Sequence, residues 1–191
     1  NRPFFVIYRP ELFPDIKESI KTWRNIAAKH GIDLYLGFMR AEITPREKFI
    51  EAGFDISIDF QPHFIKKEKW WLDPYAWIDG IRNRILKKKN FIMPVLFDYP
   101  KYVKSICSSF LSSNIKEFPG ITPNWDNAPR RQKKSFWAFK NSTPGEYGKW
   151  LRFILDHFTP YSTEENFIFI NAWNEWAEGN HLEPDQKWGC A

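Results

Sequence analysis

The chain has 191 residues, 43% of them hydrophobic, which excludes a disordered protein and predicts a single domain, residues 1–191, with a substantial core. Lysine and arginine exceed aspartate and glutamate by only 28 to 23, and no RNA- or DNA-binding signature accompanies this excess, so we expect no nucleic-acid partner. The two cysteines, Cys107 and Cys190, lack metal-ligand spacing, and no Gly-rich phosphate loop occurs. We therefore expect neither a metal nor another cofactor.

Three basic clusters, at residues 66–67, 87–89 and 130–134, are either solvated surface or attract phosphate-bearing sugars or lipid carriers. Neither a signal peptide nor a membrane-spanning run is present, so we predict no membrane span and a cytoplasmic location. The first residue stands almost directly against the first expected strand, and we expect the amino terminus of the domain to be missing.

Strands and helices alternate over the first sixty residues. Apolar runs predict the strands, and helical spacing with capping residues predicts the helices: strands at 4–8, 34–39 and 55–60, helices at 15–30 and 44–53. Tyr8 and His63 stand at or just after the ends of two of these strands, where α/β proteins present side chains to a ligand. The alternatives are a core tyrosine with a satisfied hydroxyl and a structural loop histidine.

The pattern is less regular between residues 64 and 113, where we expect a helix start at 73–74, a strand at 91–97 and a helix at 102–110. Residues 115–125 then lead to Asp126 and Arg130. This charged pair after a strand either recognises hydroxyl or carboxylate groups or ties down a loop.

A capping box, Thr143 with Glu146, predicts the start of the last long helix. Helical spacing predicts that one stripe of this helix is buried. The expected stripe is Trp150, Leu151, Ile154, Leu155 and Phe158.

The stretch 166–185 contains the most distinctive pattern in the chain. Residues 167–172 are a nearly continuous apolar run, which predicts a strand covered on both faces in a parallel sheet. Asparagine, glutamate and tryptophan residues follow at its carboxyl end, at the edge where α/β sheets and barrels place their chemistry.

Two glutamates of this stretch, Glu175 and Glu178, are three residues apart. They can share a face only if the strand bends into a helical turn, which Gly179 is suited to end. Such a pair can supply the acid and the base that chemistry at a glycosidic bond requires. The alternative is two solvated glutamates on a surface turn.

Residues 171–179 read Asn-Ala-Trp-Asn-Glu-Trp-Ala-Glu-Gly, and Leu-Glu-Pro-Asp follows at 182–185. This stretch resembles the closing signature of the WbsX-type proteins, which are called glycosyltransferases and occur in bacterial surface-polysaccharide gene clusters. Segments 4–12 and 125–131 agree with the same family, so the matches span nearly the whole chain in the right order. The resemblance also implies that the loop at 125–131 lies beside the two glutamates. These proteins are similar to the endo-acting mannosidases and mannanases of glycoside hydrolase family 99, which are (β/α)8 barrels.

The resemblance implies an α/β fold of the TIM-barrel type, (β/α)8, of which this chain would be only the C-terminal half. A complete barrel typically needs about 250 residues. A half barrel exposes strand edges, so we expect either a homo-oligomer or a partner that supplies the missing N-terminal half of the barrel.

In the hydrolase relatives, the glutamate that matches Glu175 takes a proton from the 2-hydroxyl of the sugar, and the glutamate that matches Glu178 is the general acid and base. Ala177 stands where the hydrolases have histidine, which follows the WbsX-type pattern and puts mannosidase activity in doubt. We predict Glu175 and Glu178 as catalytic residues. The predicted substrate-binding residues are Tyr8, His63, Trp125, Asp126, Arg130, Asn174 and Trp176.

The sequence therefore predicts a glycan-active enzyme that acts on an oligosaccharide or on a sugar donor and acceptor. Our first expectation is glycosyl transfer in the biosynthesis of lipopolysaccharide, O-antigen or another surface polysaccharide. One alternative is a retaining, endo-acting glycoside hydrolase of the endo-mannosidase or mannanase type. A second alternative is a non-catalytic glycan-binding subunit.

Overall fold

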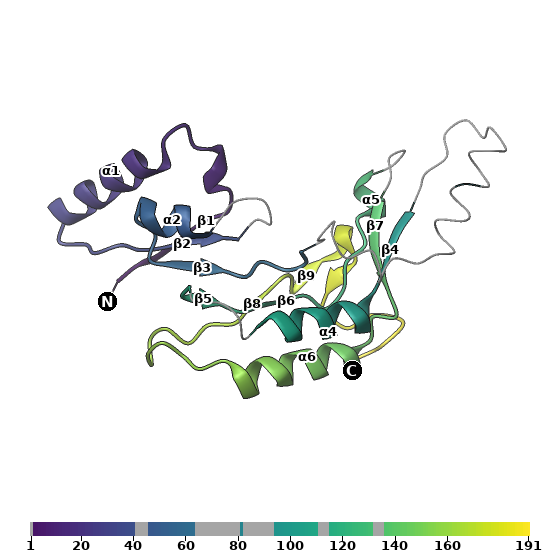
Figure 1. Ribbon diagram of the computed structural model, residues 1–191. Coiled ribbons are helices and arrows are strands. Elements are labelled where there is room, and N and C mark those ends of the chain that lie inside the picture. The colour runs from purple at the N-terminus through teal and green to yellow at the C-terminus, as the bar shows by residue number, and fades with distance from the viewer. Residues whose placement is uncertain (1, 41–45, 64–80, 82–93, 111–114, 132–135) are drawn as a thin grey trace. The chain divides into compact units, whose positions relative to one another are not determined.

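A computed structural model describes residues 2–40, 46–63, 81, 94–110, 115–131 and 136–191 (Figure 1). The chain forms two compact units: unit 1 comprises residues 1–63, 112–120 and 159–169, and unit 2 comprises residues 64–111, 121–158 and 170–191. Both contain parallel strands, so the protein is mixed α/β. The expected helix start at 73–74 and the first residues of the helix expected at 44–53 lie outside the described residues.

Unit 1 contains a parallel sheet with the strand order β1-β2-β3-β5. The helices α1 and α2 lie on one face of this sheet (Figure 1). Its elements are β1 (Phe4–Ile7), the 3-10 helix η1 (Pro10–Leu12), α1 (Ile16–Lys29), β2 (Tyr35–Met39), α2 (Arg46–Ala52), β3 (Ile56–Ile58) and β5 (Glu117–Phe118).

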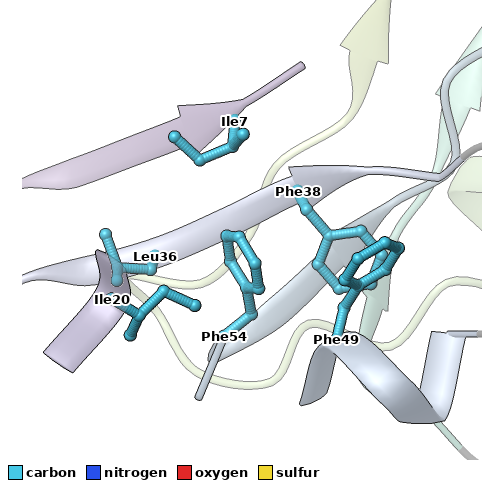
Figure 2. Close-up of a cluster of buried hydrophobic side chains, with 6 residues drawn as sticks. All are labelled: Ile7, Ile20, Leu36, Phe38, Phe49 and Phe54. Atoms are coloured by element: carbon cyan, nitrogen blue, oxygen red, sulfur yellow. The ribbon is translucent and has the colours of Figure 1, made fainter. Parts of the chain in front are cut away.

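Side chains alternate across these strands, and both faces of the sheet are covered. Toward the helices, Ile7 from β1 and Leu36 and Phe38 from β2 pack with one residue of α1, one of α2 and one from the loop before β3 (Figure 2). These partners are Ile20, Phe49 and Phe54. On the other face, Phe4 packs against the rings of Phe118 and Phe169. The strands predicted at 4–8, 34–39 and 55–60 are confirmed.

Asp55 joins α1 to β2 through a network of charged hydrogen bonds. Its Oδ2 accepts hydrogen bonds from the Leu36 amide and from Arg24 Nη2, each at 2.7 Å, and its Oδ1 accepts one from Arg2 at 3.2 Å. Burial by itself would raise the pKa of Asp55, but these three donors outweigh it and hold the pKa below its ordinary value of 3.8.

A carboxylate with a lowered pKa stabilises the folded state above the unfolded-state pKa, and this contribution is lost as the pH falls through the folded-state pKa. We expect the free energy of unfolding to decrease below about pH 4 and expect Asp55→Asn to remove part of this decrease. Urea unfolding at several pH values measures both. Asp156→Asn, at an exposed carboxylate, is the matched control and should leave the pH dependence unchanged. A wild-type pH dependence in Asp55→Asn would contradict the assignment.

Unit 2 is built around the parallel strands β4 and β7 and the neighbouring helices α4 and α6 (Figure 1). Its core is aromatic: Tyr102 contacts Phe139 with ring centroids 4.9 Å apart, and Trp150 packs against both Tyr99 and Tyr102. The elements are β4 (Pro94–Asp98), α4 (Tyr99–Ser109), α5 (Ala128–Arg131), β7 (Phe136–Lys140), α6 (Pro144–His157), β9 (Asn174–Glu175), the 3-10 helix η4 (Trp176–Glu178) and β10 (Asn180–His181). Two further strands, β6 (Gly120–Ile121) and β8 (Phe169–Ile170), pair with each other.

The helix predicted to start at the capping box of Thr143 and Glu146 is confirmed as α6. Thr143 is its N-cap, and its hydroxyl oxygen accepts a hydrogen bond from the Glu146 amide at 3.2 Å. Of the predicted buried stripe, Trp150 and Ile154 are each only 1% exposed. Leu155 was predicted to be buried and is 61% exposed, because it follows Ile154 by one residue and so points about 100° away from it around the helix.

Removing the Thr143 cap should destabilise unit 2. We expect Thr143→Ala to lower the free energy of unfolding by about 1 kcal/mol, because one of the first amides of α6 loses its acceptor. Thr163→Ala, at an exposed threonine in a loop, is the matched control and should have no measurable effect. Chemical denaturation of the three proteins tests the prediction, and equal stability of the two variants would contradict it.

The prediction for residues 167–172 is wrong in one respect. Only Phe169 and Ile170 form a strand, and Phe167 and Ile170 are each 42% exposed, so this run is not covered on both faces. Among the described residues β8 pairs only with β6, and it lacks the cover of a central strand. The described strands likewise do not close into a barrel.

Candidate functional site

The backbone makes a tight turn between β9 and β10, over residues 176–179. Glu175 ends β9, Glu178 ends the 3-10 helix η4, and Gly179 follows in the left-handed conformation with φ of 58°. The chain then returns antiparallel, with Asn180 opposite Glu175. The predicted bend, ended by Gly179, is confirmed.

The segment that follows β6 holds this turn in place. The amide of Asp126 donates a hydrogen bond to the carbonyl of Glu178 at 2.6 Å, and the side-chain amide of Asn124 donates one to the carbonyl of Gly179 at 2.9 Å. A Cβ on residue 179 would lie 3.1 Å from the Cβ of Asp126, so the two segments are in close contact. Two parts of the sequence more than fifty residues apart therefore form one local structure.

The Glu178 carboxylate is mostly buried, with 15% of its side chain exposed, and Arg130 binds it. Arg130 Nη1 donates to Oε1 of Glu178 at 2.5 Å, from a side chain that is itself 55% exposed. Asp126, by contrast, uses Oδ1 to accept the amide hydrogen of Ala128 at 2.9 Å. The structure thus brings Asp126 and Arg130 next to Glu178, in the neighbourhood that the family resemblance implied.

Glu175 has different surroundings from Glu178. Its side chain is half-buried, and no hydrogen bond or ion pair reaches its carboxylate from the residues that the structure describes. Asn174, beside it, is exposed. Arg130 therefore holds one carboxylate, and the other has no side-chain partner among the described residues.

The two tryptophans near these glutamates are held in different ways. Trp176 is 49% exposed, stacks on the His181 ring at a centroid distance of 3.7 Å, and donates its indole hydrogen to Glu183 Oε2 at 2.6 Å. Trp125 is half-buried, and its carbonyl accepts the Phe139 amide hydrogen at 2.8 Å. The sequence prediction did not include Glu183 or His181. Glu183 lies in the family-like segment 182–185 and His181 directly before it, and these positions were the signal that could have identified them.

Tyr8 and His63, the remaining predicted residues, belong to unit 1. Tyr8 is 62% exposed beyond the end of β1 and makes an edge-on contact with Phe60. His63 is buried, with Nε2 at 2.7 Å from Oδ1 of Asp59, and Asp59 also pairs with Arg40. His63, which was expected just after a strand end, is therefore oriented by a buried network with Asp59. The ligand-binding role of His63 stays a prediction.

Within the described part of the chain, no group of three histidine, cysteine, aspartate or glutamate side chains is arranged to hold a metal ion. Of the helices there, none combines the length and the apolar character that crossing a bilayer requires. The basic clusters at 66–67 and 87–89, and most of the cluster at 130–134, fall outside the described residues.

A parallel α/β fold whose post-strand turn carries two carboxylates beside a tryptophan fits a carbohydrate-active protein. A sequence model of the family described as Glycosyltransferase WbsX matches residues 1–191, and the chain belongs to this family.

Two curated relatives, both named uncharacterized protein WxcX, come from two strains of Xanthomonas campestris pv. campestris. They are 31% and 30% identical to this chain over 198 residues, which cover all of the chain and 26% of each relative. The chain thus spans about a quarter of the length of these relatives. No solved structure matches it.

Proposed function

We propose that this chain carries the reacting carboxylates of a glycan-active enzyme that acts at a glycosidic bond. The reaction proposed is glycosyl transfer in the biosynthesis of lipopolysaccharide, O-antigen or another surface polysaccharide. Membership of the family described as Glycosyltransferase WbsX supports the glycan-active role. The observation that carries the proposal is the turn over residues 176–179, in which Glu178 pairs with Arg130 and which directly follows Glu175.

The proposed roles of the two glutamates are those that the resemblance to the hydrolases of family 99 implies. Arg130 binds Oε1 of Glu178, and Glu178 would protonate the glycosidic oxygen through Oε2 as the bond from that oxygen to the sugar breaks. Glu175, which has no partner among the described residues, would accept the proton of the sugar 2-hydroxyl as that oxygen attacks the anomeric carbon. An acceptor hydroxyl would then attack the anomeric carbon and give its proton to Glu178, while the bond from the anomeric carbon to the 2-oxygen breaks and Glu175 returns its proton to that oxygen. Asn174 and Asp126 would position sugar hydroxyls.

We further propose that the chain is part of a (β/α)8 barrel. The parallel sheet of unit 1, with helices on one face, and the parallel pair in unit 2 are compatible with consecutive β/α units. The greater length of the curated relatives leaves room for the other units. Tyr8 and His63 follow the strands β1 and β3, so a barrel would place them at the edge that carries the glutamates.

Two alternatives use the same observations differently. The carboxylate pair also suits a retaining, endo-acting hydrolase of the endo-mannosidase or mannanase type, in which water replaces the acceptor hydroxyl. The ion pair between Arg130 and Glu178 suits a non-catalytic glycan-binding subunit, in which the pair only stabilises the turn.

One experiment separates the three functions. The full-length protein is incubated with oligosaccharides and with activated sugar donors, and the products are read by mass spectrometry. Transfer lengthens an acceptor by one sugar or more, and hydrolysis shortens an oligosaccharide without a donor. Binding on a glycan array, with no bond made or broken, would support the binding subunit and overturn the proposed enzyme.

A further inference from the structure

Unit 2 contains a cavity of about 460 Å³ beside the turn that carries Glu178. Three separate segments form its wall: residues 123–126 after β6, residues 142–147 after β7, and residues between Gly179 and Ala191. Asp126, which lines the cavity, is also the residue whose amide holds the carbonyl of Glu178. The volume falls in the range of small-molecule binding sites, about 300–1,000 Å³.

Two carboxylates in the wall are fixed and still have a free oxygen. Asp126 accepts the amide hydrogen of Ala128 at Oδ1, and Glu183 accepts the indole hydrogen of Trp176 at Oε2. The second oxygen of each has no hydrogen bond from any residue that the structure describes. A carboxylate held in this way is a ready acceptor for a ligand hydroxyl.

Two other wall residues have buried polar atoms that no described residue satisfies. They are the hydroxyl of Tyr147 and Nδ1 of His181. Nε2 of His181 lies 3.0 Å from Oδ2 of Asp185, which leaves Nδ1 to face another partner. Burial raises the pKa of Tyr147 to about 12, so its hydroxyl keeps its proton and can donate it in a hydrogen bond. Both atoms are buried within the wall, so they make the wall polar without contacting a ligand in the cavity directly.

The charge of the wall selects among such ligands. Asp126, Glu183 and Asp185 contribute three carboxylates, against the single ammonium of Lys187. An excess of negative charge repels phosphate and carboxylate groups. The Lys187 ammonium lies over one face of the Trp188 ring, 4.7 Å from its centroid. Trp188 is still 39% exposed, and its ring is of the kind that packs against the C–H surface of a sugar.

We propose that this cavity binds one uncharged pyranose unit of the glycan, with Glu183 and Asp126 accepting its hydroxyl groups and Trp188 packing on its ring. The inference rests on the proposed function, because it takes the ligand of the neighbouring Glu178 turn to be a glycan. It adds that the sugar bound here has no phosphate and no carboxylate. A phosphate-bearing part of a donor or lipid carrier therefore binds elsewhere.

The test uses the full-length protein carrying Glu178→Gln, so that sugars bind without turnover. Isothermal titration compares methyl glycosides of glucose, galactose, mannose and N-acetylglucosamine with glucuronic acid and glucose 1-phosphate. We expect at least one uncharged glycoside to bind more tightly than the charged sugars. Adding Glu183→Gln should weaken this binding about tenfold, because an amide nitrogen replaces the free acceptor oxygen.

Glu164→Gln is the matched control, since Glu164 is exposed and lies in unit 1. It should leave binding unchanged. Trp188→Ala is the second test variant and removes the aromatic ring from an exposed position. It should also weaken the binding of the uncharged glycoside, and it tests the inference if Glu183→Gln fails to fold. Charged sugars that bind as tightly as uncharged ones, no detectable binding of any uncharged glycoside, or full affinity in the folded cavity variants would overturn the inference.

Failure of the inference and failure of the proposed function give different results. Wild-type protein that acts on glycosidic bonds, with sugar affinity independent of Glu183 and Trp188, keeps the function and overturns the cavity assignment. Protein that binds uncharged sugars through these residues, yet neither makes nor breaks glycosidic bonds, supports the cavity and overturns the enzymatic proposal.

Discussion

Glu178→Gln should reduce turnover by a factor of about 10²–10⁴, the usual contribution of a general acid or base. Glutamine has the same size as glutamate and can still accept the hydrogen bond from Arg130, but it cannot donate a proton to the glycosidic oxygen or take one back. Sugar affinity should therefore stay close to that of the wild type. The turnover number of the full-length protein, measured on the substrate identified by mass spectrometry, checks this.

The fold should survive this change. The ion pair to Arg130 is partly exposed on the arginine side, so its loss should alter the free energy of unfolding by less than about 1 kcal/mol. Glu164→Gln makes the same chemical change on an exposed loop and should leave turnover unchanged. Wild-type turnover in Glu178→Gln would remove Glu178 from the chemistry.

The largest expected effect on stability comes from Gly120→Ala. A Cβ at this position would lie 1.7 Å from the carbonyl oxygen of Asp59 and 2.8 Å from its carbonyl carbon. Both are backbone atoms, and they cannot move freely because the Asp59 amide donates a hydrogen bond to the Phe118 carbonyl at 2.9 Å. We expect the free energy of unfolding to fall by about 3 kcal/mol or more, since overpacking here must displace β3 from β5.

Gly148→Ala is the opposite control for this prediction. Gly148 lies inside α6, and an added Cβ would meet no atom within 4 Å. Alanine is the better helix former, so this change should stabilise the protein by about 0.5–1 kcal/mol. Urea unfolding of the two variants should therefore shift in opposite directions. Equal midpoints for Gly120→Ala and the wild type would show that the approach of residue 120 to Asp59 is not as close as described.

The elements that the sequence predicts best are those whose signals are local. Asp15 accepts the Glu18 amide hydrogen at the start of α1, and Thr143 does the same for Glu146 at the start of α6, because N-caps depend only on residues a few positions away. Burial of the apolar run at 167–172 depends instead on which strands lie beside it. Hydrophobicity records a preference for burial and says nothing about whether a neighbour is present.

The candidate site divides in the same way. The turn ended by Gly179 could be predicted from the spacing of Glu175 and Glu178. That Arg130 lies close to this turn could be predicted from the family resemblance. The ion pair between Asp59 and Arg40 could not be predicted from the sequence. It depends on the strand register, in which the Arg40 amide donates a hydrogen bond to the carbonyl of Ile58.

The central claim is that Glu175 and Glu178 face the same glycosidic bond. The most direct test is a crystal structure of the full-length Glu178→Gln protein with its oligosaccharide or acceptor bound. We predict that the side chain at position 178 lies within hydrogen-bonding distance of the glycosidic oxygen and that the Glu175 carboxylate contacts a hydroxyl of the same sugar. A sugar bound away from this turn, with the two side chains pointing to different surfaces, would contradict the account.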